Sequence, residues 1–143
     1  MKKSILIFLI LITLVLTFSA CGVGTPEIED HEWKMRTVMH VVGEQLVCDA
    51  ASEESSAHPE AKIIEMTLVA KDGKITVTDI TNDETYEGTY TVSGKNPKGT
   101  DYSIVIDGKE GHATVAMTTY ADGTEEPTMP IALDDYSIYF YAE

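Results

Sequence analysis

Pairs of adjacent carboxylates are the first groups in this sequence whose types and spacing could do chemistry, as a general acid and a general base. The pairs are Glu53–Glu54, Glu125–Glu126 and Asp134–Asp135. Acid–base catalysis requires the two groups to sit in unlike environments, one of them partly removed from water. These pairs fall in segments whose composition predicts turns or loops, where both carboxylates stay solvated. The sequence also lacks a Gly-x-Ser-x-Gly elbow and a phosphate-binding loop, so we expect no catalytic residues and no enzyme.

Histidines and one oxygen-rich loop are the candidates for a metal site. The histidines are His31, His40, His58 and His112, and none has the His-x-x-x-His spacing of a helical zinc site. The run 79–84 (DITNDE) supplies carboxylate and amide oxygens, but it lacks the alternating acidic residues and the glycine of a calcium-binding loop. We therefore expect no metal ion and no other cofactor.

A cysteine at the end of an apolar leader offers a different chemistry, because its thiol can be acylated. The basic residues Lys2 and Lys3 precede an apolar run over 5–18. That run is shorter than the roughly 20 residues of a spanning helix and is typical of a secretory signal peptide. Two small residues then lead directly into Cys21. This order resembles the lipobox of bacterial lipoproteins.

The lipobox resemblance implies a location outside the cytoplasm. It implies that residues 1–20 are a removed signal peptide and that Cys21 becomes the mature N-terminus. It also implies that acyl chains such as palmitate on Cys21 anchor the protein to a bacterial membrane. Whether the host has one membrane or two stays open. With Cys21 acylated, Cys48 has no partner for an internal disulfide, so the fold must depend on a hydrophobic core, and we expect Cys48 to be a small buried side chain.

The acidic composition limits the partners that the surface can attract. The chain has 143 residues and a formal net charge of −14, which becomes −16 when Lys2 and Lys3 are removed with the leader. Nucleic acids and anionic lipid head groups both require a basic surface. We therefore expect no nucleic-acid binding and attachment to the membrane only through acyl chains.

Alternation of apolar and polar residues dominates the sequence after residue 31 and predicts β-strands. In 33–41 the odd positions are mostly apolar, and Lys34, Arg36 and His40 take the other face. The same pattern recurs in 64–68, 75–77, 86–92, 102–106, 113–117, 129–133 and 138–140. Asp-Gly pairs at 72–73, 107–108 and 122–123 predict tight hairpin turns. We expect eight or nine short antiparallel strands joined in sequence.

The strand pattern predicts an all-β domain over 31–143, preceded by a flexible tether over 21–30. A meander of about eight strands closes most economically into an up-and-down barrel, because closure removes both exposed edges. A two-sheet β-sandwich is the alternative. The interval 50–61 breaks the alternation, and Ser52 could cap a short helix there, which we expect to act as a lid.

The chain resembles the small lipocalin-like, calycin-type lipoproteins of bacteria. The residues that carry this resemblance are the lipobox, the tryptophan that opens the first strand in His31-Glu-Trp33, the triplet Gly88-Thr-Tyr90 and the aromatic closing strand over 135–142. The resemblance implies a barrel of lipocalin type. It implies no particular ligand.

Large adaptable side chains share the phase that should point into the barrel. They are Trp33, Met35, Met39, Met66, Tyr86, Tyr90, Tyr102 and Met117. Methionine adapts to irregular shapes, so such an interior could accept an apolar ligand, although the same side chains could simply fill a solid core. Tyr139 and Tyr141 point outward from the last strand, where they could meet a partner or pack beneath the segment 50–61.

These features favour a non-enzymatic binding protein over an enzyme. We expect a lipid-anchored monomer that captures a small apolar or amphiphilic molecule in its barrel. The alternative is a protein-interaction module, such as an envelope-protecting inhibitor that binds a basic partner through its acidic surface. The sequence identifies neither the ligand nor the partner.

Overall fold

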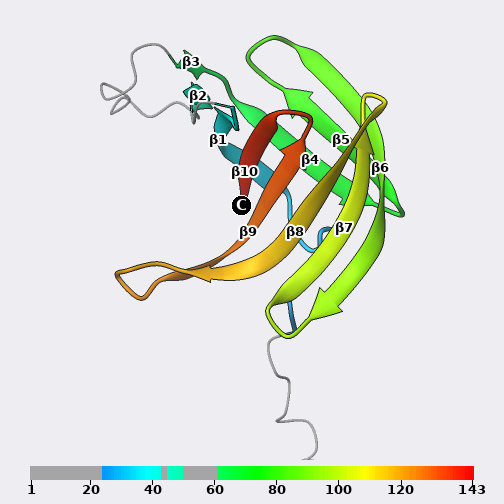
Figure 1. Ribbon diagram of the computed structural model, residues 1–143, viewed down its shortest axis with the longest axis vertical. Helices are drawn as coiled ribbons and strands as arrows, with labels where there is room; N and C mark the ends of the chain where they lie inside the picture. The colour runs from blue at the N-terminus through cyan, green and yellow to red at the C-terminus, as the bar shows by residue number, and fades with distance from the viewer. Residues whose placement is uncertain (1–23, 43–44, 50–60) are drawn as a thin grey trace, which may run out of the picture.

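An antiparallel β-barrel makes up the domain (Figure 1). The computed structural model describes residues 24–42, 45–49 and 61–143, and every regular element in these residues is a strand. The expected helix or lid in 50–61 lies outside the described residues, apart from Ala61. The predicted all-β barrel is confirmed, and the alternative sandwich is not what forms.

The meander closes on itself with eight strands. Along the barrel the order is β1, β4, β5, β6, β7, β8, β9 and β10, and β10 pairs with β1. The strands are β1 (Trp33–His40), β2 (Gln45–Asp49), β3 (Lys62–Ile63), β4 (Met66–Lys71), β5 (Lys74–Asp79), β6 (Glu84–Asn96), β7 (Gly99–Ile106), β8 (Lys109–Thr119), β9 (Glu125–Leu133) and β10 (Tyr136–Ala142).

Two of the three Asp-Gly pairs form the tight hairpin turns that the sequence predicts, whereas the pair at 122–123 lies in the longer loop 120–124, where Gly123 alone of the pair has positive φ. Asp72 and Gly73 have φ of 50° and 78°, and Asp107 and Gly108 have φ of 50° and 75°. Positive φ at both central residues is the geometry whose twist matches that of the flanking strands. These turns keep β4–β5 and β7–β8 in register from the first pair onward.

A bulge in β1 changes which of its residues face the core. The register with β10 shifts between Met35 and Thr37, so Met35 lies opposite Phe140 and Val38 lies opposite Ile138. A bulge adds one residue to a strand and thereby reverses the facing of the residues after it. Val38 is therefore buried, and the expectation that Met39 points inward is wrong.

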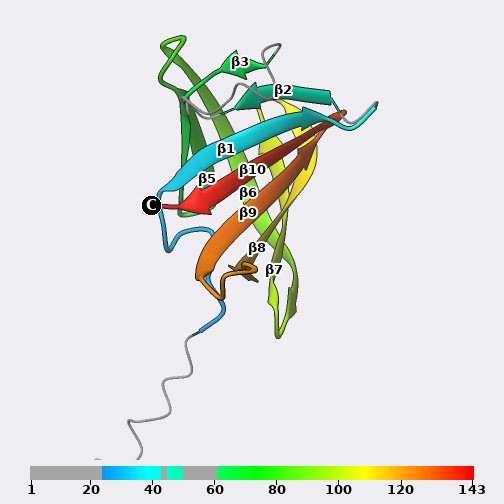
Figure 2. The same cartoon turned by 90° about the vertical axis from the view of Figure 1, so that its left-hand side faces the viewer.

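The barrel wall is incomplete along the second half of β1. This strand pairs with β4 only at Trp33–Leu68 and Lys34–Thr67, and from Thr37 onward it pairs with β2 instead. Figure 2 shows β2 and β3 continuing from β1 as a flap beside the barrel. The split between β1 and β4 opens one end of the barrel, which we call the mouth.

The N-terminal segment seals the other end, which we call the closed end. Pro26 is buried and Ile28 is only 1% exposed. The Ile28 N–H donates to the hydroxyl of Tyr102 at 3.1 Å, and the Trp33 indole donates to the Ile28 carbonyl at 2.8 Å. The expected tether over 21–30 is corrected accordingly: the folded domain begins by Pro26, before His31.

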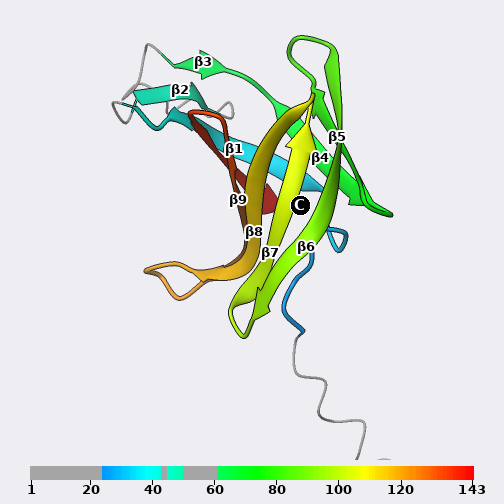
Figure 3. The same ribbon diagram turned by 45° about the vertical axis from the view of Figure 1, so that its right-hand side comes forward.

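Acidic side chains of the N-terminal segment tie it to the turns of the closed end. Glu29 accepts hydrogen bonds from the Asp72 N–H, at 2.9 Å, and from the Tyr90 hydroxyl, and Glu27 pairs with Lys95. In Figures 1 and 3 this segment lies beneath the barrel, away from the turns at the mouth. The chain therefore enters the domain at the closed end.

Candidate functional site

An apolar pocket of about 420 Å³ lies inside the mouth. Its inner part is formed by core side chains, and half-buried side chains near the strand ends widen it toward solvent. The lining residues are Val38, Val47, Met66, Val77, Tyr86, Ile106, Asp107, Lys109, Ile131, Leu133, Tyr136, Ile138 and Phe140. Binding sites for small molecules are concave and mostly apolar, with a few polar groups, and this pocket has that composition.

Exposed apolar side chains surround the mouth. Val41 and Val42 lie after β1, Ile63 ends β3, and Ile80 follows β5; Val42 is 69% exposed. Single exposed apolar residues are ordinary on a protein surface. Here Val41, Val42 and Ile80 lie in connections at the mouth end of the barrel, so apolar side chains are exposed beside the opening of the pocket.

A tyrosine and several carboxylates give the mouth its electrostatic character. The Tyr86 hydroxyl donates to Glu84, and this hydrogen bond, with partial burial, raises the pKa of Tyr86 to about 12. The negative charges of Asp79 and Asp107 act in the same direction. A phenol resists ionisation where carboxylates are close, so the Tyr86 hydroxyl remains a hydrogen-bond donor to Glu84.

An ion pair and a pair of hydrogen bonds stabilise the turns at the mouth. The Lys109 ammonium lies 3.1 Å from Asp134, and hydrogen bonding to that carboxylate raises the pKa of Lys109. Asp79 is buried at the end of β5 and accepts from the N–H and the side-chain amide of Asn82, at 2.9 and 2.8 Å. The turn 80–83 is thereby fixed beside the pocket.

The structure divides the predicted interior residues between the two ends of the barrel. Met66 and Tyr86 line the pocket, together with core residues that the alternation of apolar and polar residues also predicts to face inward. Trp33, Met35 and Tyr102 are fully buried in the solid core toward the closed end. Tyr90 is half-buried there, with its ring edge-on to Tyr102 at 5.7 Å between centroids. Burial raises the pKa of Tyr102.

Two methionines lie away from the core. Met39 leaves the inward phase at the β1 bulge. Met117 is 39% exposed, because the hairpin of β8 and β9 extends beyond the barrel at that level (Figure 1). The expected interior position of both residues is therefore corrected.

Three of the pocket residues that were not singled out from the sequence lie near two turns of the meander. Ile106, Leu133 and Ile138 are inward residues next to the connections 107–108 and 134–135. In an up-and-down meander, alternate turns lie at the same end of the barrel. That rule, applied to the inward residues near these turns, could have identified these three residues.

The outward tyrosines of β10 line a separate groove of about 390 Å³, which we call the outer groove. Arg36 is its centre: the guanidinium carbon lies 4.5 Å from the Tyr141 ring centroid. Arg36 also donates to the Tyr120 hydroxyl at 2.9 Å and pairs with Glu126 at 3.0 Å. Tyr139 lines the same groove and is 43% exposed.

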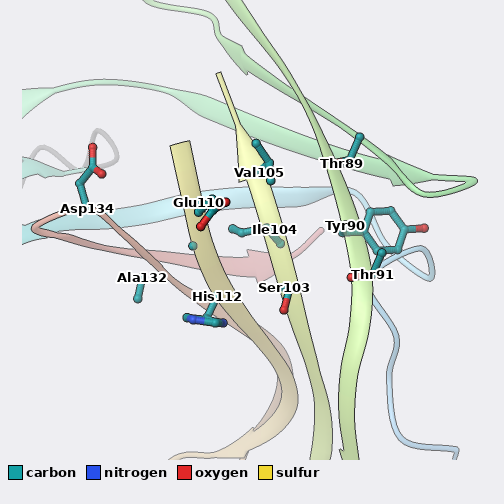
Figure 4. A pocket seen from close by; sticks show the side chains of 11 residues that line it. Thr89, Tyr90, Thr91, Ser103, Ile104, Val105, Glu110, His112, Ala132 and Asp134 are labelled. Atoms are coloured by element: carbon teal, nitrogen blue, oxygen red, sulfur yellow. The ribbon is translucent and has the colours of Figure 1, made fainter. Parts of the chain in front are cut away.

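A depression of about 710 Å³ lies on the outer face of β6 to β9 (Figure 4). Ser103 on β7 stands opposite His112 on β8, near Glu110. Hydrolysis by such a set needs a serine–histidine hydrogen bond and free N–H donors for an oxyanion. No hydrogen bond joins these two described side chains, and both strands are paired on each side. The arrangement therefore lacks the parts of a nucleophilic site.

Metal-binding groups do not gather in the described residues. In these parts of the chain, no three His, Cys, Asp or Glu side chains are placed to hold a metal ion. The residues described also include no helix that is long and apolar enough to cross a membrane. The expected burial of Cys48 concerns a side chain outside the described part of the structure.

Comparison of the chain with protein-family models, with curated proteins and with solved structures finds no significant match. The barrel and its pocket are therefore the basis for the functional argument.

Proposed function

We propose that this protein is a non-enzymatic binding protein that takes a small apolar or amphiphilic molecule into the pocket at the barrel mouth. The single observation that carries the proposal is the apolar cavity of about 420 Å³, open at one end of a barrel that is solid at the other. Pockets that bind small molecules have volumes of roughly 300–1,000 Å³.

The energetics fit a weak to moderate binder of alkyl or aromatic molecules. Each buried methylene contributes roughly 0.8 kcal/mol, so about eight methylenes contribute ~6 kcal/mol before the cost of association is subtracted. Entry into a preformed pocket requires little reorganisation, which keeps that cost low. Dissociation constants in the micromolar range or weaker are the expected outcome.

The proposed membrane anchor suits this arrangement. If Cys21 carries acyl chains, as the lipobox resemblance implies, the anchor joins the domain at the closed end, because the folded part begins by Pro26. The residues between Cys21 and Pro26 span at most ~18 Å when extended. The closed end would then face a bacterial membrane, and the mouth would face the extracytoplasmic space.

Filling the pocket with a larger side chain should weaken ligand binding. We expect the uncharged dye N-phenyl-1-naphthylamine to bind saturably with enhanced fluorescence, and Ile138→Trp to weaken its binding at least about tenfold, because the indole occupies the cavity. Fluorescence titration measures both. The matched control is Val69→Trp, which adds the same side chain at an exposed position of β4.

The dye experiment has clear contrary outcomes. Absence of saturable binding, or equal binding by Ile138→Trp and Val69→Trp, contradicts the proposal. Circular dichroism and thermal melts of both variants establish that they fold. A loss of dye binding that occurs only in Ile138→Trp then results from filling the pocket.

The outer groove favours a second candidate function, binding of a protein partner. Tyrosine and arginine dominate the energetics of protein interfaces, and the groove brings Arg36, Tyr120, Tyr139 and Tyr141 together. The chain's acidic charge would attract a basic partner, as an envelope-protecting inhibitor of cell-wall hydrolases requires.

Inhibition of lysozyme, a basic cell-wall hydrolase, tests the second candidate. We expect Tyr139→Ala to weaken inhibition roughly tenfold, and Tyr136→Ala, with similar exposure at the mouth, to leave it unchanged. Inhibition should fall steeply as salt is raised. No inhibition at low salt, or equal losses in the two variants, excludes this version of the function.

A further inference from the structure

Carboxylates collect in and beside the turns that border the mouth. They are Asp79, Asp83, Glu84, Asp107, Asp134 and Asp135. Lys109 lies beside the same turns, but its ammonium is already paired with Asp134. The opening of an apolar pocket is thus bordered by excess negative charge.

The lysines of the barrel lie mainly at the opposite end. Lys71 and Lys74 flank the turn at Asp72–Gly73, and Lys95 and Lys98 are at the β6–β7 connection. Lys34 pairs with Glu143 near the C-terminus. These lysines offset the acidic side chains of the N-terminal segment, so the excess of negative charge is greater at the mouth than at the closed end.

Aromatic rings stand among the carboxylates. Tyr86 and Tyr136 line the pocket near its opening, and the Tyr136 ring contacts His40 edge to face at 5.2 Å. Tyrosine faces attract ammonium groups, most strongly where water is partly excluded. An organic cation with an apolar tail would fit this arrangement. Its charge would contact the carboxylates and tyrosine rings at the opening, and its tail would enter the apolar cavity.

We propose that the pocket selects a cationic amphiphile, its apolar part inside the barrel and its ammonium group among Glu84, Asp107 and the tyrosines at the mouth. This inference rests on the proposed function, since it specifies the ligand of the same pocket. A carboxylate, sulfate or phosphate head group in that position meets like charges, and the Lys109 ammonium beside it is already paired with Asp134.

Three amphiphiles with the same decyl tail distinguish the contribution of the head group to the binding affinity from that of the apolar tail in the pocket. They are decyltrimethylammonium, uncharged decyl glucoside and decyl sulfate, each used to displace the uncharged dye from the protein below its micellar concentration. We expect decyltrimethylammonium to bind at least about tenfold more tightly than decyl sulfate, with decyl glucoside between them. Added salt should narrow the difference, because exposed charges are screened over about 10 Å at 0.1 M.

A matched pair of variants tests whether the preference for a cation arises from the carboxylates at the mouth or from the net charge of the whole chain. Asp107→Asn and Asp72→Asn make the same substitution in turns of the same geometry, with φ of 50° at both aspartates. Only Asp107 lines the pocket. We expect Asp107→Asn to weaken decyltrimethylammonium binding by up to roughly fivefold, the usual scale of an exposed ion pair, and Asp72→Asn to leave it unchanged.

The possible results distinguish this inference from the function on which it rests. Failure of the dye and of all three amphiphiles to bind overturns both. Binding of the dye with equal affinity for the cationic and anionic amphiphiles overturns the inference alone. Equal weakening by Asp107→Asn and Asp72→Asn also overturns it, because the preference would then arise from net charge and not from the mouth.

Discussion

Replacement of Gly88 by alanine is expected to destabilise the barrel by about 3 kcal/mol, the upper end of the usual cost of overpacking. Gly88 lies in the middle of β6, between Ile75 on β5 and Ile106 on β7. A Cβ atom there would stand 2.1 Å from the Val105 carbonyl oxygen and 3.1 Å from the Ile106 Cα. Both atoms belong to the backbone, so the relief of this overlap requires β6 and β7 to separate. Urea unfolding measures the loss.

Gly94→Ala provides the control for Gly88→Ala in the same strand. Its Cβ would have ordinary contacts, the nearest at 3.4 Å from a carboxylate oxygen of Asp101. We expect a change of less than about 1 kcal/mol, since alanine also restricts the unfolded chain. If the two variants unfold at the same urea concentration, the close approach of β6 to β7 is not present in solution.

The fold was predictable because its determinants are local. Alternation depends on neighbouring residues, and the Asp-Gly turns at 72–73 and 107–108 need only their own two residues to adopt positive φ. A meander with short connections then leaves little choice of strand order. Closure follows because open edges are unfavourable.

The facing of Met39 was not predictable, because the bulge depends on a strand distant in sequence. β1 fits β10 through Met35 opposite Phe140 and Val38 opposite Ile138, and both contacts are possible only with an extra residue between them. The alternation of β1 alone gives no sign of this insertion. The site is affected directly, since Val38, in place of Met39, borders the pocket.

The division of the barrel into a solid end and a hollow end is also a long-range property. The alternation of apolar and polar residues predicts one interior that contains Met66, Tyr86, Trp33 and Tyr102. Their separation follows from the N-terminal segment, which supplies Ile28 to one end, and from the split between β1 and β4 at the other. The strand patterns themselves contain neither feature.

The N-terminal segment is the part of the core with the weakest signal in the sequence. Ile28 stands alone among acidic residues, glycine and proline, so no periodicity marks it as buried. Its position is set by the Tyr102 hydroxyl, 74 residues along the chain, and by the indole of Trp33. The structure therefore assigns a sealing role to a residue that composition places in a tether.

Ile28→Ala is expected to lower the free energy of unfolding by about 2–5 kcal/mol, the usual cost of truncating a fully buried isoleucine. The truncation leaves a cavity in the core near Trp33, whose indole donates to the Ile28 carbonyl. Trp33 is 0% exposed and is the only tryptophan in the chain. Water that enters this cavity should shift the Trp33 emission to longer wavelength. Urea unfolding followed by tryptophan fluorescence measures stability and local exposure in one experiment.

Ile80→Ala is the matched control, because it makes the same truncation at a residue that is half exposed at the mouth. We expect it to change stability by less than about 0.5 kcal/mol and to leave the Trp33 emission unchanged. Equal stability of the two variants, with unshifted emission in both, would mean that the N-terminal segment is not seated against the barrel.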